Sequence, residues 1–266
     1  MSLRFGLRPL ELVACALVAG CTPSPVRWSG DRTVDVGSAA TALTPTGLVT
    51  EDSLGTLAMR LVPPTVSCAG SLQLARMGGR LFAVWWSPRP DSSAMLASAS
   101  SGDGGATWSA AVPVDTTDRG MTGCARVPAA IAADAASGYV HVTYAMLATE
   151  GPGIFFAHSM DRGASFHAPV PILYGERLGR ATVAAEGDFV VVAFEDPSSR
   201  TPRIGLAVSR TMGHIFEDRV LPVSDDNGAA AQPLVALHQH RLTVAWQQRG
   251  ADRAGIVLRI RSGNLP

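Results

Sequence analysis

Few side chains in this sequence have the type and the spacing that chemistry at a site needs. His238 and His240 are two residues apart and would place two imidazoles, which are common metal ligands, on one side of a strand. Residues 225–228, Asp-Asp-Asn-Gly, match part of a calcium-binding loop. However, the histidines precede Leu242 at a turn, and no glutamate follows to complete the loop, so solvated turns are the favoured interpretation of both. The sequence therefore predicts no metal site and no cofactor.

The elements that would position a site are marked by an eight-residue pattern. Ser101 to Trp108 and Ser159 to Phe166 both follow Ser-x-Asp-x-Gly-x-(Ser/Thr)-aromatic, and Ser209 to Phe216 is a third copy with Thr211 in the Asp place. Asp103 and Asp161 are 58 positions apart, and Thr211 follows 50 positions later. This spacing is about the size of one four-stranded propeller blade.

The repeated pattern resembles the Asp-box, or BNR, repeat of sialidase-like β-propellers. The resemblance implies an all-β propeller of four-stranded antiparallel blades, with each box in a turn between two strands and away from the catalytic face. An Asp there accepts hydrogen bonds from turn N–H groups, and a Gly supplies a backbone angle closed to other residues. The aromatic fills a gap beside the neighbouring strand. We therefore expect structural roles for Ser101, Asp103, Gly105, Trp108, Ser159, Asp161, Gly163 and Phe166.

Strand-like segments surround the boxes in register. They are rich in β-branched and aromatic residues and are separated by Gly, Asp and Pro, which is typical of short strands. The expected strands are 72–75, 80–86, 94–100 and 109–114 in the first blade, 129–133, 139–144, 154–159 and 168–172 in the second, 182–185, 189–194, 204–209 and 219–223 in the third, and 234–237, 242–246 and 256–260 in the fourth. Residues 32–37 are expected to supply the missing strand and close the ring by pairing the chain ends. Residues 38–63 would form extra strands or part of a fifth blade.

The N-terminal residues have the features of a targeting signal. Arg4 and Arg8 precede an apolar stretch, residues 12–19, that is too short to span a bilayer. Residues 18–21, Val-Ala-Gly-Cys, resemble the lipobox of bacterial lipoproteins. We therefore expect a signal peptide (1–20), lipidated Cys21 with a tether (21–31), and a propeller domain (32–266) in the cell envelope, lipid-anchored on the periplasmic face of the outer or the inner membrane. The alternative is an uncleaved amphipathic or short anchoring segment, with Glu11 as the charge at its edge.

The composition and the remaining cysteines set further limits. The formal net charge is zero, with 22 basic and 22 acidic residues, so no polyanionic partner such as nucleic acid is indicated. Cys68 and Cys124 are 56 residues apart, one repeat length, and each precedes the innermost strand of its blade. Equivalent positions in adjacent blades lie close together near the propeller axis. A disulfide is therefore expected in an oxidising compartment, with two buried free thiols as the alternative.

Sialidase chemistry would need more than the boxes. By resemblance to that family, the catalytic candidates are Arg126 and Arg180, which precede innermost strands, and Glu195, which follows an inner strand. The tyrosines available for a nucleophile pair are Tyr139, Tyr144 and Tyr174. The nearest match to the family's Arg-Ile-Pro motif, residues 60–63, has one residue too many, and a six-bladed ring needs a longer chain. No spacing here demonstrates the fixed geometry of arginine–carboxylate recognition.

We therefore predict a non-enzymatic, lipid-anchored propeller that serves as a protein-docking or accessory subunit of a membrane-associated assembly. The alternative is a carbohydrate-binding propeller or sialidase-like glycoside hydrolase that uses the central mouth near Arg126, Arg180 and Glu195. Trp85-Trp86 bears on docking, because alternation along a strand puts one indole on each side. The alternative is that both indoles pack between the blades.

Overall fold

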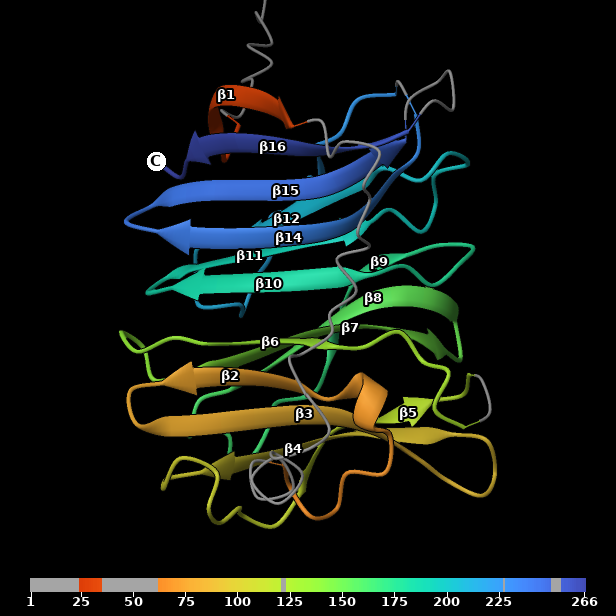
Figure 1. The fold of residues 1–266 in the computed structure, drawn as a ribbon, viewed down its shortest axis with the longest axis vertical. Helices are drawn as coiled ribbons and strands as arrows, with labels where there is room; N and C mark the ends of the chain where they lie inside the picture. The colour runs from red at the N-terminus through yellow and green to blue at the C-terminus, as the bar shows by residue number, and fades with distance from the viewer. Residues whose placement is uncertain (1–23, 35–61, 121–122, 227, 250–254) are drawn as a thin grey trace, which may run out of the picture.

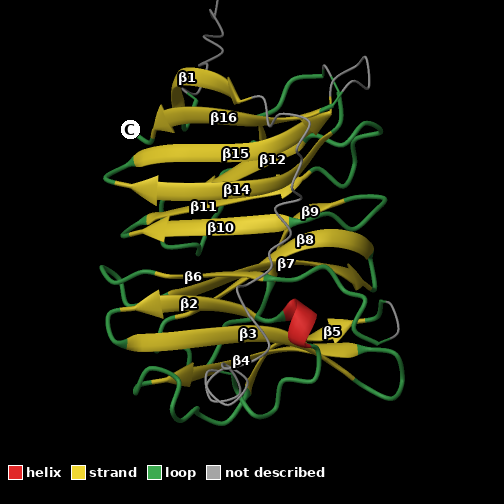
Figure 2. Ribbon diagram, viewed as in Figure 1, coloured by secondary structure: helices red, strands yellow, loops and turns green. Residues whose placement is uncertain are grey.

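The computed structural model describes residues 24–34, 62–120, 123–226, 228–249 and 255–266. This part of the chain folds into four antiparallel four-stranded sheets with one short 3-10 turn, η1 (Ala69–Ser71) (Figures 1 and 2). The sheets are the blades of a β-propeller, which confirms the all-β prediction. Among the described residues, no helix is long and apolar enough to cross a membrane. The signal peptide, Cys21 and most of residues 38–63 lie outside the described residues.

The boundaries of the strands follow the repeats. Blade one contains β2 (Gln73–Met77), β3 (Arg80–Pro88), β4 (Ala94–Ser101) and β5 (Val112–Asp118). Blade two contains β6 (Ala130–Ala133), β7 (Val140–Ala148), β8 (Gly151–Ser159) and β9 (Val170–Tyr174). Blade three contains β10 (Ala181–Glu186), β11 (Phe189–Glu195), β12 (Ile204–Ser209) and β13 (Leu221–Pro222). Blade four contains β14 (Ala230–His238), β15 (Arg241–Arg249), β16 (Ile256–Asn264) and β1 (Arg27–Val34).

The fourth blade combines one N-terminal strand with three C-terminal strands. Its strand order is β14-β15-β16-β1, and β1 pairs antiparallel with β16 from Arg27 opposite Asn264 to Val34 opposite Leu258. The expected pairing of N- and C-terminal strands is therefore present. The strand begins at Arg27, five residues before the expected 32–37 segment, and its described part ends at Val34.

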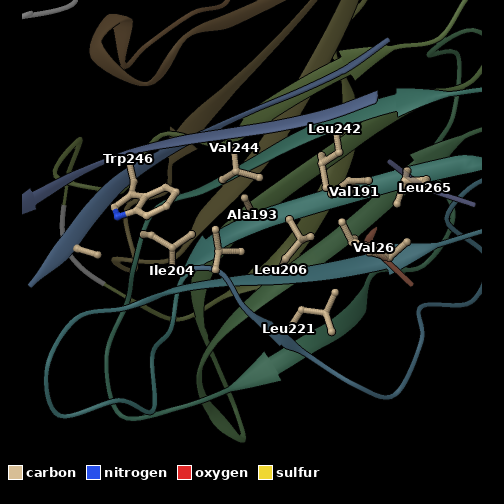
Figure 3. Packing of buried hydrophobic residues seen from close by; sticks show 13 residues of the cluster. Val26, Val191, Ala193, Ile204, Leu206, Leu221, Leu242, Val244, Trp246 and Leu265 are labelled. Atoms are coloured by element: carbon tan, nitrogen blue, oxygen red, sulfur yellow. The ribbon is translucent and has the colours of Figure 1, made fainter. Parts of the chain in front are cut away.

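Neighbouring blades pack face to face through their apolar residues. One cluster joins blades one and two around Trp86 and Tyr144, and a second joins blades two and three around Phe156 and Phe194. A third joins blades three and four, where Trp246 lies over β12 (Figure 3). The innermost strands meet in the order β2, β6, β10, β14. Among the described strands, blades one and four are not packed together in this way, so the four blades stand in a row (Figure 1). The pairing of the chain ends thus completes blade four, and the expected closure of the ring is not seen among the described strands.

The two tryptophans of β3 separate as alternation predicts. Trp86 packs toward blade two, where its ring meets Tyr144 edge-on at 5.9 Å and its indole N–H donates to the Val127 carbonyl at 2.9 Å. Trp85 is equally buried on the opposite face of blade one, with Ala83, Ala97 and Ala99. Both indoles are therefore part of the packed core.

Candidate functional site

The three box turns share one hydrogen-bond arrangement. In the first, the Ser101 hydroxyl accepts the Gly105 N–H at 2.8 Å and donates to Asp103, and Asp103 accepts the Thr107 N–H at 2.9 Å and its hydroxyl at 2.6 Å. The second repeats these bonds with Ser159, Asp161, Gly163 and Ser165. In the third, the Thr211 hydroxyl accepts the Ile215 N–H at 2.9 Å and Ser209 accepts the Gly213 N–H. The box side chains close their own turns.

The carboxylates of the boxes are held in their charged form. The hydroxyl and N–H of Thr107 lower the pKa of Asp103 to about 2. Burial acts to raise the pKa of Asp161, but the hydrogen bonds from Ser165 and Ser159 outweigh it and bring the pKa to about 2. An acid with so low a pKa is a poor proton donor at neutral pH. This chemistry fits a turn-fixing role.

The glycines of boxes two and three also dock their turns on the preceding blade. Gly163 has a φ of +81° and a Cβ there would lie 3.1 Å from the ring of Phe82 in blade one. Gly213 has a φ of +87°, and a Cβ there would lie 2.5 Å from Phe156 in blade two. Only glycine satisfies both the left-handed backbone and the close approach. Boxes two and three are therefore inter-blade contacts as well as turns.

Removing the buried serine of a box should destabilise the protein more than removing its exposed acid. Ser159→Ala leaves the buried Gly163 N–H without an acceptor and should lower the free energy of unfolding by about 1–3 kcal/mol. Asp161→Ala and Asp103→Ala should cost less because water reaches the freed turn groups, and Thr211→Ala least. Urea titrations would measure the order, with Ser29→Ala, whose hydrogen bond is exposed, as the control. Loss of binding or activity in a fully folded Asp103→Ala protein would contradict a structural role.

Arg126 is buried, and it lies in the segment that leads from β5 of blade one to β6 of blade two. Its guanidinium donates to Asp118 at 2.9 Å and to the main-chain oxygens of Gly123, Ser92 and Gly120 at 2.6, 2.9 and 3.1 Å. The ion pair with Asp118 is 2.8 Å long, with both side chains no more than 4% exposed. These contacts hold the β3–β4 loop and the segment between β5 and β6 in place, and a ligand carboxylate would have to displace them.

Glu195 and Arg180 meet at the end of β11, but through main-chain groups. The Glu195 carboxylate accepts the N–H of Arg180 at 3.1 Å and the N–H of Gln232 at 2.8 Å. It thereby fastens β10 and β14 to β11. The Arg180 residue is exposed. The geometry thus brings two of the three catalytic candidates together while using the carboxylate as a strand clamp.

The other candidates of the sequence lie apart from these residues. Tyr144 is buried between blades one and two, where burial and the neighbouring Asp115 carboxylate, 2.5 Å from its hydroxyl, raise its pKa. Tyr174 lies at the end of the outermost strand β9. At the His238–His240 turn, Glu186 accepts two main-chain N–H groups. The described residues contain no group of three or more His, Cys, Asp or Glu side chains arranged to hold a metal ion.

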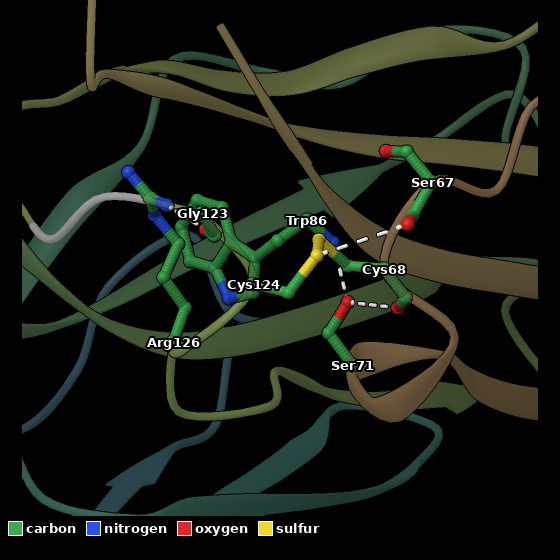
Figure 4. Close-up of a disulfide and its surroundings, with 7 residues drawn as sticks. All are labelled: Ser67, Cys68, Ser71, Trp86, Gly123, Cys124 and Arg126. Carbon is green, nitrogen blue, oxygen red and sulfur yellow. Dashed lines mark hydrogen bonds between the residues drawn. A yellow bond between two sulfur atoms is a disulfide. The ribbon is translucent and has the colours of Figure 1, made fainter.

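Cys68 and Cys124 form a disulfide with a Cα–Cα distance of 5.3 Å (Figure 4). It joins the segment before β2 to the segment before β6, and so it links blade one to blade two. Beside it, the Ser71 hydroxyl donates to the Cys68 carbonyl at 2.8 Å and accepts the Trp86 N–H at 3.0 Å. The disulfide is therefore anchored to the core strand β3.

Sequence reasoning missed a cluster of histidines between blade two and the third box. His141 and His158 are buried on β7 and β8, and the rings of His167 and His214 lie 4.7 and 4.5 Å from the ring of His158. Tyr139 stacks on His158 at 5.8 Å. A signal was available, because three of the six histidines, His158, His167 and His214, fall within or beside the second and third boxes.

One face of blade four is exposed. Along β15, buried and less buried residues alternate, and Leu242, Val244 and Trp246 are the buried set facing blade three. Cross-strand partners share a face. The opposite side, which we call the free face, therefore carries Arg32, Val34, Leu234, Ala236, His238, Arg241, Thr243, Ala245, Gln247, Leu258, Ile260 and Ser262. Leu234 is 67% exposed and Val34 45%. At one edge a cavity of about 280 Å³ is lined by Arg32, Arg241 and Ile260.

Comparisons with known proteins support the fold and go no further. No family model and no curated protein matches this sequence. A solved protein of unknown function from Dyadobacter fermentans is similar over 77% of this chain and 60% of its own, with 15% identity and a TM-score of 0.55. A Trypanosoma rangeli sialidase solved with sialic acid matches 67% of this chain and 34% of its own, with 13% identity and a TM-score of 0.45. A thermostable family-43 glycoside hydrolase matches 71% and 69%, with 14% identity and a TM-score of 0.44. This chain thus spans 60% or less of the first two proteins.

Proposed function

We propose that this protein is a non-enzymatic, lipid-anchored β-propeller that docks another protein of a membrane-bound assembly through the free face of blade four. The observation that carries the proposal is the exposed apolar surface of this face, with Leu234 on β14 and Val34 on β1 among its most exposed side chains. Apolar surface of this kind, bordered by polar residues, is typical of protein interfaces.

The charges at the border indicate the chemistry of the partner. Arg32 and Arg241 line the cavity at the edge of the free face, and among the described residues neither makes an ion pair. A partner with an apolar centre and acidic residues around it would complement both features.

The position of the face favours a partner at the membrane. Six positions separate Cys21, the proposed lipidated residue, from Arg27 at the start of β1, a reach of at most about 20 Å. Strand β1 carries Arg32 and Val34 of the free face. Lipidation of Cys21 would therefore keep this edge beside the bilayer, in the cell envelope.

Docking is tested by comparing substitutions on two faces of the molecule. The protein is purified from native membranes in gentle detergent as wild type, as Leu234→Glu and as Ile215→Glu, which alters an equally exposed residue of the third box. We expect a stoichiometric partner that co-purifies with the wild type and with Ile215→Glu but not with Leu234→Glu. Added salt should reduce the amount of bound partner in the wild type, and should reduce it less in Arg32→Gln/Arg241→Gln. A free monodisperse lipoprotein, or equal loss in both variants, would contradict the proposal.

The enzymatic alternative has its own outcome. Its catalytic set would have to include Arg126 and Glu195, whose polar groups bind main-chain and carboxylate groups of the protein itself. A screen against sialosides and uronate-bearing glycans covers this class. Turnover that Glu195→Gln abolishes in a folded protein would replace docking with glycoside hydrolysis.

A further inference from the structure

The histidine cluster occupies a place that the sister blades fill with other residues. Pairing to the box serines aligns the blades, because Leu81, Val140 and Val190 lie opposite Ser101, Ser159 and Ser209. One step further along, His141 pairs with His158 in blade two. The equivalent pairs are Phe82 with Ser100 in blade one and Val191 with Val208 in blade three. The fold therefore does not require an ionisable residue at either position.

The box turn of the following blade packs against these positions. Gly163 of box two packs against Phe82. Gly213 of box three packs against Phe156, and a Cβ at Gly213 would also lie 3.6 Å from Nδ1 of His141. His214, the next residue of box three, stands edge-on over the ring of His158 at 4.5 Å. A contact that is apolar between blade one and box two thus contains imidazoles between blade two and box three.

The buried imidazoles lack the partners that a charged form needs. His141 is fully buried and His158 is 6% exposed, and both ring nitrogens of His141 and Nε2 of His158 make no hydrogen bond. A protonated imidazole is a double donor that must be hydrogen-bonded or solvated. Protonation would therefore place unsatisfied charge between blade two and box three.

The groups around the cluster do not stabilise a protonated imidazole enough to offset its burial. Asp134 is the one carboxylate that favours a charged His141, and it already accepts N–H groups of Ala136, Ser137 and Gly187. The other titratable groups on the packed elements are Tyr139, Asp161, Arg162, His167, Asp188, Arg210, His214, Glu217 and Asp218. Burial, followed by the neighbouring His158, lowers the pKa of His141 to about 4, and burial, followed by His214 and His167, does the same for His158.

Box three is also tied to both described ends of the chain. Arg210, its second residue, donates to the main-chain oxygen of Pro266 at 2.6 Å and to that of Pro25 at 3.3 Å, and pairs with Glu217 at 3.0 Å. Pro25 lies two residues before β1. Movement of box three would therefore reach the strand that completes blade four.

We propose that the histidine cluster is a proton-operated latch, which holds box three on blade two at neutral pH and releases it in mild acid. Folding favours the neutral imidazoles, whereas the unfolded chain takes up protons at its ordinary histidine pKa. The latch is complete above about pH 6.5 and weakens as the pH falls from there toward about 4. The inference does not depend on docking.

The test replaces the two histidines with residues of the sister blades. In the full-length protein in detergent, His141→Phe/His158→Val should match the wild type at pH 7.5 and retain its melting temperature at pH 5, where the wild type should lose about 5 °C or more. Val191→Ile, on blade three, is a matched control that should keep the wild-type acid loss. Equal acid loss in the wild type and the double variant would overturn the latch.

A local measurement keeps the proposal testable if the double variant folds poorly. Hydrogen exchange, corrected for intrinsic rates, should show the Gly213 and Ile215 amides of box three opening about tenfold more at pH 5 than at pH 7.5. The matching amides of box two, Gly163 and Ser165, should not. Equal opening of both boxes would overturn the latch. Stabilisation of the wild type by Zn²⁺ at pH 7.5 that His158→Val abolishes would overturn it in favour of a metal site.

Discussion

Arg126→Met should lower the free energy of unfolding by about 3–5 kcal/mol, because it leaves the buried Asp118 carboxylate without its counter-charge. The substitution also removes donors to the carbonyls of Ser92, Gly120 and Gly123. Asp118 would keep a weak bond from the Leu147 N–H at 3.3 Å. Urea unfolding of the wild type and the variant, followed by tryptophan fluorescence, measures the difference.

A double variant separates the ion pair from the packing. Arg126→Met/Asp118→Leu removes both charges and should recover part of the loss, since an apolar pair avoids a lone buried charge. Arg180→Met, at an exposed residue, is the matched control and should change stability little. A stable, folded Arg126→Met protein that had lost only ligand binding would show that Arg126 belongs to a binding site.

The fold was predictable because its rules are local and repeated. The box turns depend on residues within four positions of each other, and alternation along the strands assigns each side chain to a face. The extra length of β14, β15 and β16 was less visible, because residues such as Gln247, Arg261 and Ser262 extend strands through cross-strand pairing and not through their own propensity.

The site was less predictable, because it depends on partners distant in the sequence. An arginine before an innermost strand resembles a substrate ligand until Asp118 and three carbonyls are seen around it. Glu195 is similar, since its acceptor role requires Gln232, which lies 37 residues away. The four clustered histidines come from two strands and two turns, and no single motif contains them. Long-range pairing decides whether a polar side chain is free for function.

Removing the Cys68–Cys124 disulfide should lower the free energy of unfolding by about 4 kcal/mol, the loop-closure value for a cross-link that spans 56 residues. The loop contains all of blade one. In the unfolded chain, the cross-link therefore holds the two ends of this segment together and lowers its conformational entropy. Urea titrations with and without excess reductant measure the effect, and the Cys68→Ser/Cys124→Ser protein, which should not respond to reductant, is the control. A loss below about 1 kcal/mol would mean that the Trp86–Tyr144 cluster alone holds these blades together, and that the unfolded chain remains compact without the cross-link.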